Sequence, residues 1–501
     1  MSRRKIVLMQ PRCGKYDLYI CDLPLSLIYL AAVPVARGYE VVIVDQRVEA
    51  DWRRTLAEHL TDDVLMVGVT VMTGEPIRHA LEMCREVRRR SSRPIVWGGI
   101  HPTLTPEQVV RHELADYVIR EMGEYAIAEL AEHLEGKREV ADVSALTHVR
   151  DGRVVHNALA KSFNFDALPR IPYELVDQRR YHRSGFPHPV ISVMTSRNCP
   201  HRCAFCYNSS RRGAPKYVAE PLERTRRTLA ALVEQYRPAY LSFIDDNFFV
   251  DRTRARAILE FIRDRKWDLE IGFRGARVDD LLRCDEEMYE LMEAVRTRHI
   301  NIGVESGSAR ILEILQKGIT PQMAIELNRR LARYPSLIPL YNFFSGIPQE
   351  TEGDIRLSTD LVLQLIRENP SCQISGFHQY TPYPGSTLYE AAKASGFPEP
   401  ATLEGWASMQ LENNARNCPW IDRKRRRLLD MIYTMIYFAD RKYEVYFAGQ
   451  SWLHRVLVPL VKLYRPVCRA RLRHHITALP VEVWAKDVFY RLMERSERVE
   501  A

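Results

Sequence analysis

The chain has 501 residues, of which 46% are hydrophobic and 27% are charged, and its formal net charge is +8. This composition is that of an ordinary globular protein of about two or three domains, which needs no disulfide framework to fold. We expect no signal peptide, because residues 2–5 lead directly into a short strand-like run and not into an apolar segment. The longest early uncharged stretch, residues 23–36, is too short to span a bilayer.

Short apolar runs alternate with amphipathic stretches over the first 135 residues. The runs predict parallel strands at 6–9, 41–44, 66–69, 95–97 and 117–119, and helices between them at 27–37, 52–60, 76–90 and 126–134. Asp51 can cap the second helix, and Pro76 suits a first helical turn. The alternation predicts an α/β, Rossmann-like domain over residues 1–135, with ligands bound beyond the carboxyl ends of its strands.

Residues 136–185 are interpreted as a connector. We expect a small hairpin formed by residues 137–140 and 154–156, followed by an extended crossing marked by Pro169, Pro172 and Pro187.

Six further strand-like runs predict a second unit over residues 186–400. They lie at 190–194, 240–244, 270–273, 300–304, 340–344 and 373–380, with helical patterns between them at 221–236, 254–265, 309–316, 321–334 and 354–369. Ser308 and Thr320 are good N-caps, and Pro321 suits the first helical position. Six such units predict a partial (β/α)6, TIM-like barrel with its reactive groups at the carboxyl ends of the strands.

Three cysteines, Cys199, Cys203 and Cys206, lie in the loop after the first strand of this unit. Three thiolates can hold three irons of a [4Fe–4S] cluster and leave the fourth iron open to a small chelating molecule. Zinc with His201 as fourth ligand is an alternative, but four ligands from eight residues would be strained. A disulfide is the other alternative. The remaining cysteines are scattered singly, which predicts core residues in a reducing, cytoplasmic compartment: Cys13, Cys21, Cys84, Cys284, Cys372, Cys418 and Cys468.

The cysteine spacing, with Phe205 before the last cysteine, resembles the radical S-adenosylmethionine (radical SAM) superfamily over about residues 188–395. The resemblance implies that Cys199, Cys203 and Cys206 bind the cluster, that SAM binds the open iron, and that one electron cleaves SAM to a 5′-deoxyadenosyl radical. Polar strand ends fit this reading, because carboxylates there can accept hydrogen bonds from SAM, although Asp246, Glu350 and Thr351 could equally cap helices. Arg274 and Arg277 could each pair with a carboxylate. The implied SAM contacts are Phe205, Asp245, Asp246, Arg277, Glu305 and Ser306.

The first domain looks like the cobalamin-binding domain found before many radical SAM cores. The resemblance rests on Pro24-Leu25-Ser26-Leu27, on Gly98-Gly99 with His101-Pro102-Thr103, and on the strand order. Two departures are Asp45-Gln46-Arg47-Val48, which lacks the family's cobalt-ligating histidine, and residues 120–124, where relatives tend to show Gly-Glu-Gly-Glu. The alternative is a Rossmann-like scaffold that binds no ligand. A nucleotide-binding site has less support, because no GxGxxG motif follows the first strand. The implied cobalamin contacts are Arg47, Thr70, Thr73, Gly98, Gly99 and His101.

The C-terminal region, residues 401–501, is expected to be helical and basic. Residues 421–475 contain 13 Lys or Arg and 4 Asp or Glu, a net of +9. The region could be a helical cap on the open barrel, a surface for an anionic membrane through Trp452, Tyr464 and the flanking arginines, or a nucleic-acid surface. We do not expect nucleic acid, because no RNA-binding signature is visible.

The two resemblances together imply an enzyme with a [4Fe–4S] cluster, SAM and cobalamin that methylates an unactivated carbon of a small-molecule or lipid-linked substrate. An external one-electron donor of the flavodoxin or ferredoxin type would reduce the cluster. A cobalamin-dependent oxidative cyclase, like the anaerobic porphyrin cyclases, is one alternative. A non-catalytic iron–sulfur redox protein is the other, although such a relay needs no open iron. The expected location is the cytoplasm, with peripheral membrane contact if the basic region binds lipid.

Overall fold

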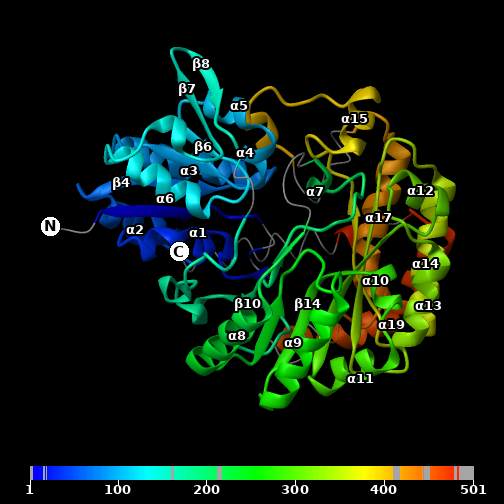
Figure 1. Ribbon diagram of the computed structural model, residues 1–501. Helices are drawn as coiled ribbons and strands as arrows, with labels where there is room; N and C mark the ends of the chain where they lie inside the picture. Colours follow the sequence, from blue (N-terminus) through cyan, green and yellow to red (C-terminus); the bar gives the residue numbers. More distant parts are fainter. Residues whose placement is uncertain are drawn as a thin grey trace.

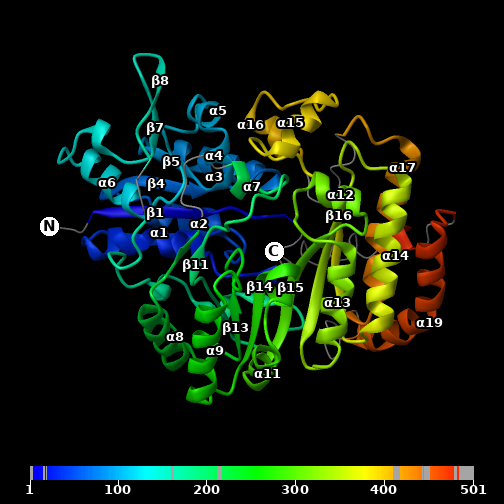
Figure 2. The ribbon, with the colours of Figure 1, turned by 45° about the vertical axis from the view of Figure 1, so that its right-hand side comes forward.

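The computed structural model describes residues 4–14, 17, 20–159, 163–210, 217–409, 418–442, 444, 452–478 and 482–484. The chain forms two main sheets, each with its own helices, and two long C-terminal helices lie at the outer edge of the second sheet (Figure 1, Figure 2). This arrangement confirms the predicted α/β architecture of a Rossmann-like domain, a partial barrel and a helical C-terminal region.

The first sheet has the strand order β3-β1-β4-β5-β6-β7-β8, and its first five members are parallel. These are β1 (Lys5–Gln10), β3 (Glu40–Asp45), β4 (Val64–Thr70), β5 (Ile95–Gly98) and β6 (Tyr117–Ile119). The helices are α1 (Leu25–Ala36), α2 (Trp52–His59), α3 (Glu75–Arg90), α4 (Ile100–Leu104), α5 (Pro106–Val110) and α6 (Glu124–Leu134). Asp51 accepts a hydrogen bond from the Arg54 backbone and Pro76 lies in the first turn of α3, as predicted.

Both faces of this sheet are covered, which explains its continuous apolar strands. On β1, Ile6 and Leu8 pack with buried residues of α1 and α6, whereas Val7 and Met9 pack with those of α2 and α3. Because successive side chains of a strand point to opposite faces, an unbroken apolar run is what a sheet between two helical layers requires.

The expected hairpin exists, but its first strand was misplaced. It consists of β7 (Leu146–Arg150) and β8 (Arg153–His156), which extend the first sheet antiparallel to β6 as far as residue 156. Residues 137–139 instead follow the C-terminus of α6, where Gly136 has a φ of +76° and the Lys137 backbone donates to the Glu132 carbonyl, and Val140 begins a short 3-10 helix. The charged stretch is therefore a helix terminus, and the strand begins at the buried Leu146.

The second sheet has six parallel strands in sequence order, which confirms the partial barrel. They are β10 (Val190–Val193), β13 (Tyr240–Phe243), β14 (Glu270–Arg277), β15 (Thr297–Glu305), β16 (Ile338–Ser345) and β17 (Gln373–Gln379). The predicted helices are α8 (Leu222–Tyr236), α9 (Arg252–Arg265), α12 (Ala309–Ile314), α13 (Pro321–Leu331) and α14 (Glu352–Glu368), and α10 (Val278–Leu282) and α11 (Glu286–Ala294) were not foreseen. Ser308 and Thr320 cap α12 and α13 through their hydroxyls, as predicted.

The C-terminal helices close the open edge of this barrel. After α15 (Thr387–Ala394) and α16 (Leu403–Ala407), α17 (Arg423–Ala439) packs against β17, and α19 (Trp452–His474) packs against α17 and α14. Just after α17, Asp440 accepts a hydrogen bond from the Ile374 backbone N–H at 2.7 Å, and the Lys442 ammonium donates to the Ile374 carbonyl. These contacts satisfy backbone groups of the edge strand β17. Among the described helices, none has the length and apolarity needed to cross a membrane.

Candidate functional site

A cavity of about 460 Å³ lies where the carboxyl ends of the two sheets face each other. Thr70, Gly98, Gly99 and Met122 line it from the first domain, and Met194 and Asp246 are among the residues that line it from the barrel. The carboxyl edge is the ligand-binding edge both in doubly wound sheets and in βα barrels. A group bound here would therefore contact both domains at the edges where each is built to bind ligands.

The backbone at Gly98 and Gly99 forms part of the cavity wall. Gly99 has a φ of +97°, and a Cβ added there would lie 2.8 Å from both the backbone nitrogen and the carbonyl oxygen of Val71. A Cβ at Gly98 would have the Ile119 carbonyl oxygen as its nearest neighbour, at an ordinary 3.7 Å. Gly99 is thus required by the fold itself, whereas Gly98 leaves open surface on the cavity side.

Three other residues expected at the cobalamin site lie outside the cavity wall. Arg47 pairs with Asp45 through two hydrogen bonds, of 2.9 and 2.6 Å. His101 is fully buried beside the Trp406 ring and hydrogen-bonds Thr73 at 3.1 Å. Burial lowers the pKa of His101 to about 3, so the ring is neutral. These residues anchor the loops after β3, β4 and β5, and a contact of theirs with cobalamin stays a prediction.

The cysteine loop is tied to the neighbouring strand ends of the barrel. Its Ala204 backbone N–H donates to the Leu315 carbonyl at 2.8 Å. Arg277, at the end of β14, donates to the Cys203 sulfur at 3.2 Å and to Asp279 at 2.9 Å. The Arg277 guanidinium therefore places a positive charge beside the Cys203 sulfur. Arg277, expected to contact SAM, contacts Cys203 in this structure, and its contact with SAM stays a prediction.

The donor set fits a [4Fe–4S] cluster better than a zinc ion. Among the described residues, one group of three His, Cys, Asp or Glu ligand atoms lies within 4.8 Å, and it does not contain the cysteines. At least one pair of the three sulfurs therefore lies more than 4.8 Å apart, whereas sulfurs of a tetrahedral zinc site lie about 3.8 Å apart. Burial raises the pKa of Cys199, and that of Cys206 to about 12, so metal binding must displace protons from both thiols.

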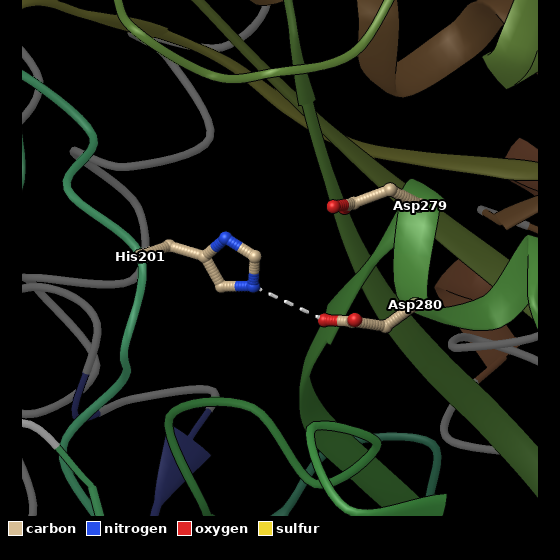
Figure 3. A group of neighbouring side chains, drawn as sticks. All are labelled: His201, Asp279 and Asp280. Atoms are coloured by element: carbon tan, nitrogen blue, oxygen red, sulfur yellow. Dashed lines mark ion pairs between the residues drawn. The ribbon is translucent and has the colours of Figure 1, made fainter.

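The group within 4.8 Å consists of His201, Asp279 and Asp280 (Figure 3). The His201 ring points at Asp280, with 3.3 Å between Nε2 and the carboxylate oxygen, and so is engaged away from a fourth zinc position. Asp280 also accepts a hydrogen bond from the Asn247 amide, and Asp279 faces Arg277. Each carboxylate already faces its own donor, so the group holds the cysteine loop against β14 and α10.

The two aspartates after β13 have different environments. Asp245 is buried and accepts hydrogen bonds from the Thr195 backbone and hydroxyl and from the Ser196 hydroxyl. Burial raises the pKa of Asp245, and its contacts hold the segment that leads to the cysteine loop. Asp246 is exposed on the cavity wall, 3.3 Å from the hydroxyl of Tyr207, which directly follows Cys206. Asp246 and Tyr207 together form a polar patch beside the cysteine loop.

The remaining candidate SAM contacts shape the end of β15. Glu305 has a φ of +75° and forms an ion pair of 2.8 Å with Lys317, whose ammonium lies 5.7 Å from the centre of the Phe205 ring. The Ser306 hydroxyl lies 3.1 Å from that of Ser358 and is fully buried. The structure therefore brings Phe205 and Glu305 together through Lys317. Their contact with SAM stays a prediction.

A buried ion pair between the two domains was not predicted. Glu124, the first residue of α6, pairs with Arg197, which lies two residues before Cys199, and both line the cavity. The guanidinium carbon of Arg197 lies 4.4, 5.3 and 5.5 Å from the ring centres of Phe163, Tyr29 and Phe165. The pair therefore joins the cobalamin-type domain to the strand that carries the cysteine loop. The sequence marked Glu124 only as the end of an altered motif.

Two family models match the chain, in the order of its two domains. The B12 binding domain matches residues 21–131, and the radical SAM superfamily matches residues 193–362. The uncharacterized methyltransferase PH0819 of Pyrococcus horikoshii is 30% identical over 377 residues, which are 74% of this chain and 79% of the relative. The anaerobic magnesium-protoporphyrin IX monomethyl ester cyclase of Synechocystis is 23% identical over 385 residues, 74% of this chain and 72% of the relative.

Solved structures share the fold. The radical SAM methyltransferase TsrM of Kitasatospora setae, with tryptophan and a SAM analogue bound, has a TM-score of 0.62 at 21% identity, over 79% of this chain and 77% of that one. OxsB, with aqua-cobalamin and SAM bound, has a TM-score of 0.71 at 15% identity, over 98% of this chain and 76% of that one. With both domain models in place and a relative at 30% identity, the chain belongs to the family of cobalamin-dependent, B12-binding radical SAM enzymes.

Proposed function

We propose that this protein is a C-methyltransferase that methylates an unactivated carbon of a small-molecule or lipid-linked substrate. The observation that carries the proposal is the shared cavity, where the ligand-binding edge of the cobalamin-type domain faces Asn198 and Tyr207, the residues that flank the cysteine loop of the barrel. When bound, the cluster and SAM supply a 5′-deoxyadenosyl radical and cobalamin supplies the methyl group. Methylation at carbon needs both groups close to one substrate, which one cavity between the two domains allows.

The chain's own residues have distinct roles in this proposal. Cys199, Cys203 and Cys206 hold the cluster, and Arg277 keeps positive charge at the Cys203 sulfur. Gly98 offers backbone without a side chain, so a flat macrocycle can lie against the ends of β4 and β5. The exposed carboxylate of Asp246 can accept hydrogen bonds from SAM or from substrate.

Oxidative ring closure is the second candidate function, because the magnesium-protoporphyrin ester cyclase covers a similar share of the chain. Methyl transfer is favoured because the relative at 30% identity bears the name of a methyltransferase. The two outcomes differ in product mass, since methylation adds one CH₂ unit and ring closure removes hydrogen.

The test is anaerobic turnover of the reconstituted protein with SAM, cobalamin, a reductant and extracts of small molecules or lipids. We expect 5′-deoxyadenosine and S-adenosylhomocysteine together, and a product that carries a deuterated methyl group from labelled SAM. The source of the substrate would be metabolites or lipids that change in a deletion strain. An intact cluster that never cleaves SAM would instead support a non-catalytic redox role.

We also propose two partners. An external one-electron donor of the flavodoxin or ferredoxin type reduces the cluster, since cleavage of SAM needs one electron. The basic C-terminal region makes a peripheral contact with an anionic membrane, which would bring the enzyme to a lipid-linked substrate.

A further inference from the structure

The long helix α19 buries one face and exposes an apolar stripe on the other. Val461, Cys468 and Leu472 are buried against the protein, and the Cys468 thiol donates to the Met435 carbonyl of α17. Leu460, Leu463 and Val467 are 55%, 79% and 49% exposed. Their spacing of three and four residues places them on one side of the helix. The helix itself lies at the outer edge of the molecule (Figure 2).

The same helix carries only positive charge. Residues 452–474 contain six Lys or Arg and no Asp or Glu. Arg465 and Arg471 turn inward and pair with Glu444 and Glu482. Lys462 and Arg473 are exposed, and the helical register places both on one flank of the apolar stripe. The outward face is therefore apolar along its middle and basic along its side.

We propose that the outward face of α19, with Leu460, Leu463 and Val467 at its centre, docks on an anionic lipid bilayer. Apolar side chains would enter the boundary between headgroups and acyl chains, while Lys462 and Arg473 would meet the acidic headgroups. A nucleic acid would complement the positive charge but would leave the exposed leucines in water. An apolar groove of a partner protein would bury the leucines but would not explain why the helix carries only positive charges. This proposal assigns residues to the membrane contact of the proposed function, and it rests on that function for the reason why the enzyme would bind a membrane.

The contact differs from the one that the sequence indicated. Tyr464 lies between helix and protein, where Arg471 donates to its hydroxyl at 3.2 Å and Glu482 accepts from it. It is therefore not available to a bilayer, whereas its neighbour Leu463 is. The side chain of Trp452 lies outside the described part of the chain. The arginines at 425–427 lie on α17, and two of the three are partly buried.

The test is co-sedimentation of the full-length, reconstituted protein with vesicles of phosphatidylcholine alone or mixed with phosphatidylglycerol, at low and high salt. The variants are Leu463→Glu and Lys462→Glu. The matched controls are Val149→Glu, an exposed valine on β7 in the first domain, and Arg227→Glu, an exposed arginine on α8. All four positions are partly or largely exposed, so each variant is expected to fold.

We expect binding to anionic vesicles that weakens at high salt. Leu463→Glu should weaken it about tenfold or more, and Lys462→Glu about fivefold or more, with both controls unchanged. Equal recovery of wild type and Leu463→Glu would overturn the proposal, as would equal binding to neutral and anionic vesicles. If the apolar stripe instead joins two copies of the chain, the wild type should be a dimer that Leu463→Glu abolishes, with vesicle binding unchanged. That result would also overturn the proposal. SAM cleavage and cobalamin content are measured on the same samples, so failure of docking is distinct from failure of the proposed enzymatic function.

Discussion

The ion pair between Glu124 and Arg197 makes a quantitative prediction about how the two domains are held together. The side chains of Arg197 and Glu124 are 10% and 5% exposed, and among the described residues Arg197 Nε and Glu124 Oε2 have no hydrogen-bond partner. Glu124→Gln removes one charge and leaves the guanidinium buried among three aromatic rings. Breaking a buried pair in this way costs about 3–5 kcal/mol of folding free energy, most of it from the unpaired charge.

The assay is urea unfolding of the apoprotein, with Glu82→Gln as the matched control. Glu82 on α3 pairs with Arg53 on α2, and their side chains are 38% and 48% exposed, respectively. Because this pair is solvated, its loss should lower the free energy of unfolding by at most about 1 kcal/mol. Glu124→Gln combined with Arg197→Met should recover much of the stability, because it removes the unpaired charge. In the loaded enzyme, Glu124→Gln should also alter the magnetic coupling between cob(II)alamin and the reduced cluster, since the pair links their two domains.

Two results would refute this reasoning. One is a Glu124→Gln variant as stable as Glu82→Gln to within about 0.5 kcal/mol, which would mean that the pair is solvated in solution. The other is an unchanged magnetic coupling in Glu124→Gln with full contents of both cofactors. The first result would show that the pair does not stabilise the fold, and the second would show that it does not set the relative position of the two cofactors.

Three further predictions concern the cysteine loop, the Gly98-Gly99 turn and the buried carboxylate of Glu350, which accepts a hydrogen bond from the Gly346 backbone. Cys203→Ala should lose both the cluster, measured as iron and sulfide content, and SAM cleavage, because two thiolates cannot hold the cube; retained iron would contradict this. Gly98→Val should fold yet retain less cobalamin on gel filtration. Gly99→Val should instead lower the melting temperature, because its Cβ would meet the Val71 backbone at 2.8 Å. Equal cobalamin retention by Gly98→Val and wild type would mean that the first domain is a scaffold that does not bind cobalamin at this loop. Burial raises the pKa of Glu350 from 4.5 to about 7, so the folded state favours its protonated form and stability should fall as pH rises from about 4.5 to about 7. Glu350→Gln should remove that part of the pH dependence of unfolding, and an unchanged pH profile would contradict it.

Sequence reasoning worked where a local signal and the fold agree. The parallel strands of both sheets were foreseen because their apolar runs are buried between helical layers, as on β1, and the caps at Asp51, Ser308 and Thr320 use their side chains as expected. It failed at residues 137–140, where the run of mixed charge gave no sign that Gly136 ends α6 and that the strand starts later. It also gave no sign of α10 and α11.

The candidate site shows the same division. Spacing alone singled out the three cysteines and the pair Gly98-Gly99, because ligand loops leave short motifs in the chain. It could not separate Asp245 from Asp246, since the burial that ties Asp245 to Thr195 and exposes Asp246 depends on packing. Contacts between residues far apart in the chain, such as Arg277 with Cys203, leave no mark in one sequence.

The opposed sheets give a reason why the interdomain pair is charged. An apolar contact between α6 and β11 (Ser196–Arg197) would hold the domains together without fixing their relative orientation, because apolar surfaces can slide. A buried carboxylate and guanidinium are costly in any arrangement except the paired one, so the Glu124–Arg197 pair penalises displacement of either domain. The cavity lies between the groups that this pair aligns, with Gly98 on one wall and Asp246 on the other. A reaction that passes a group from one bound cofactor to a carbon activated by another needs such fixed geometry, because small displacements of reacting atoms cost large factors in rate.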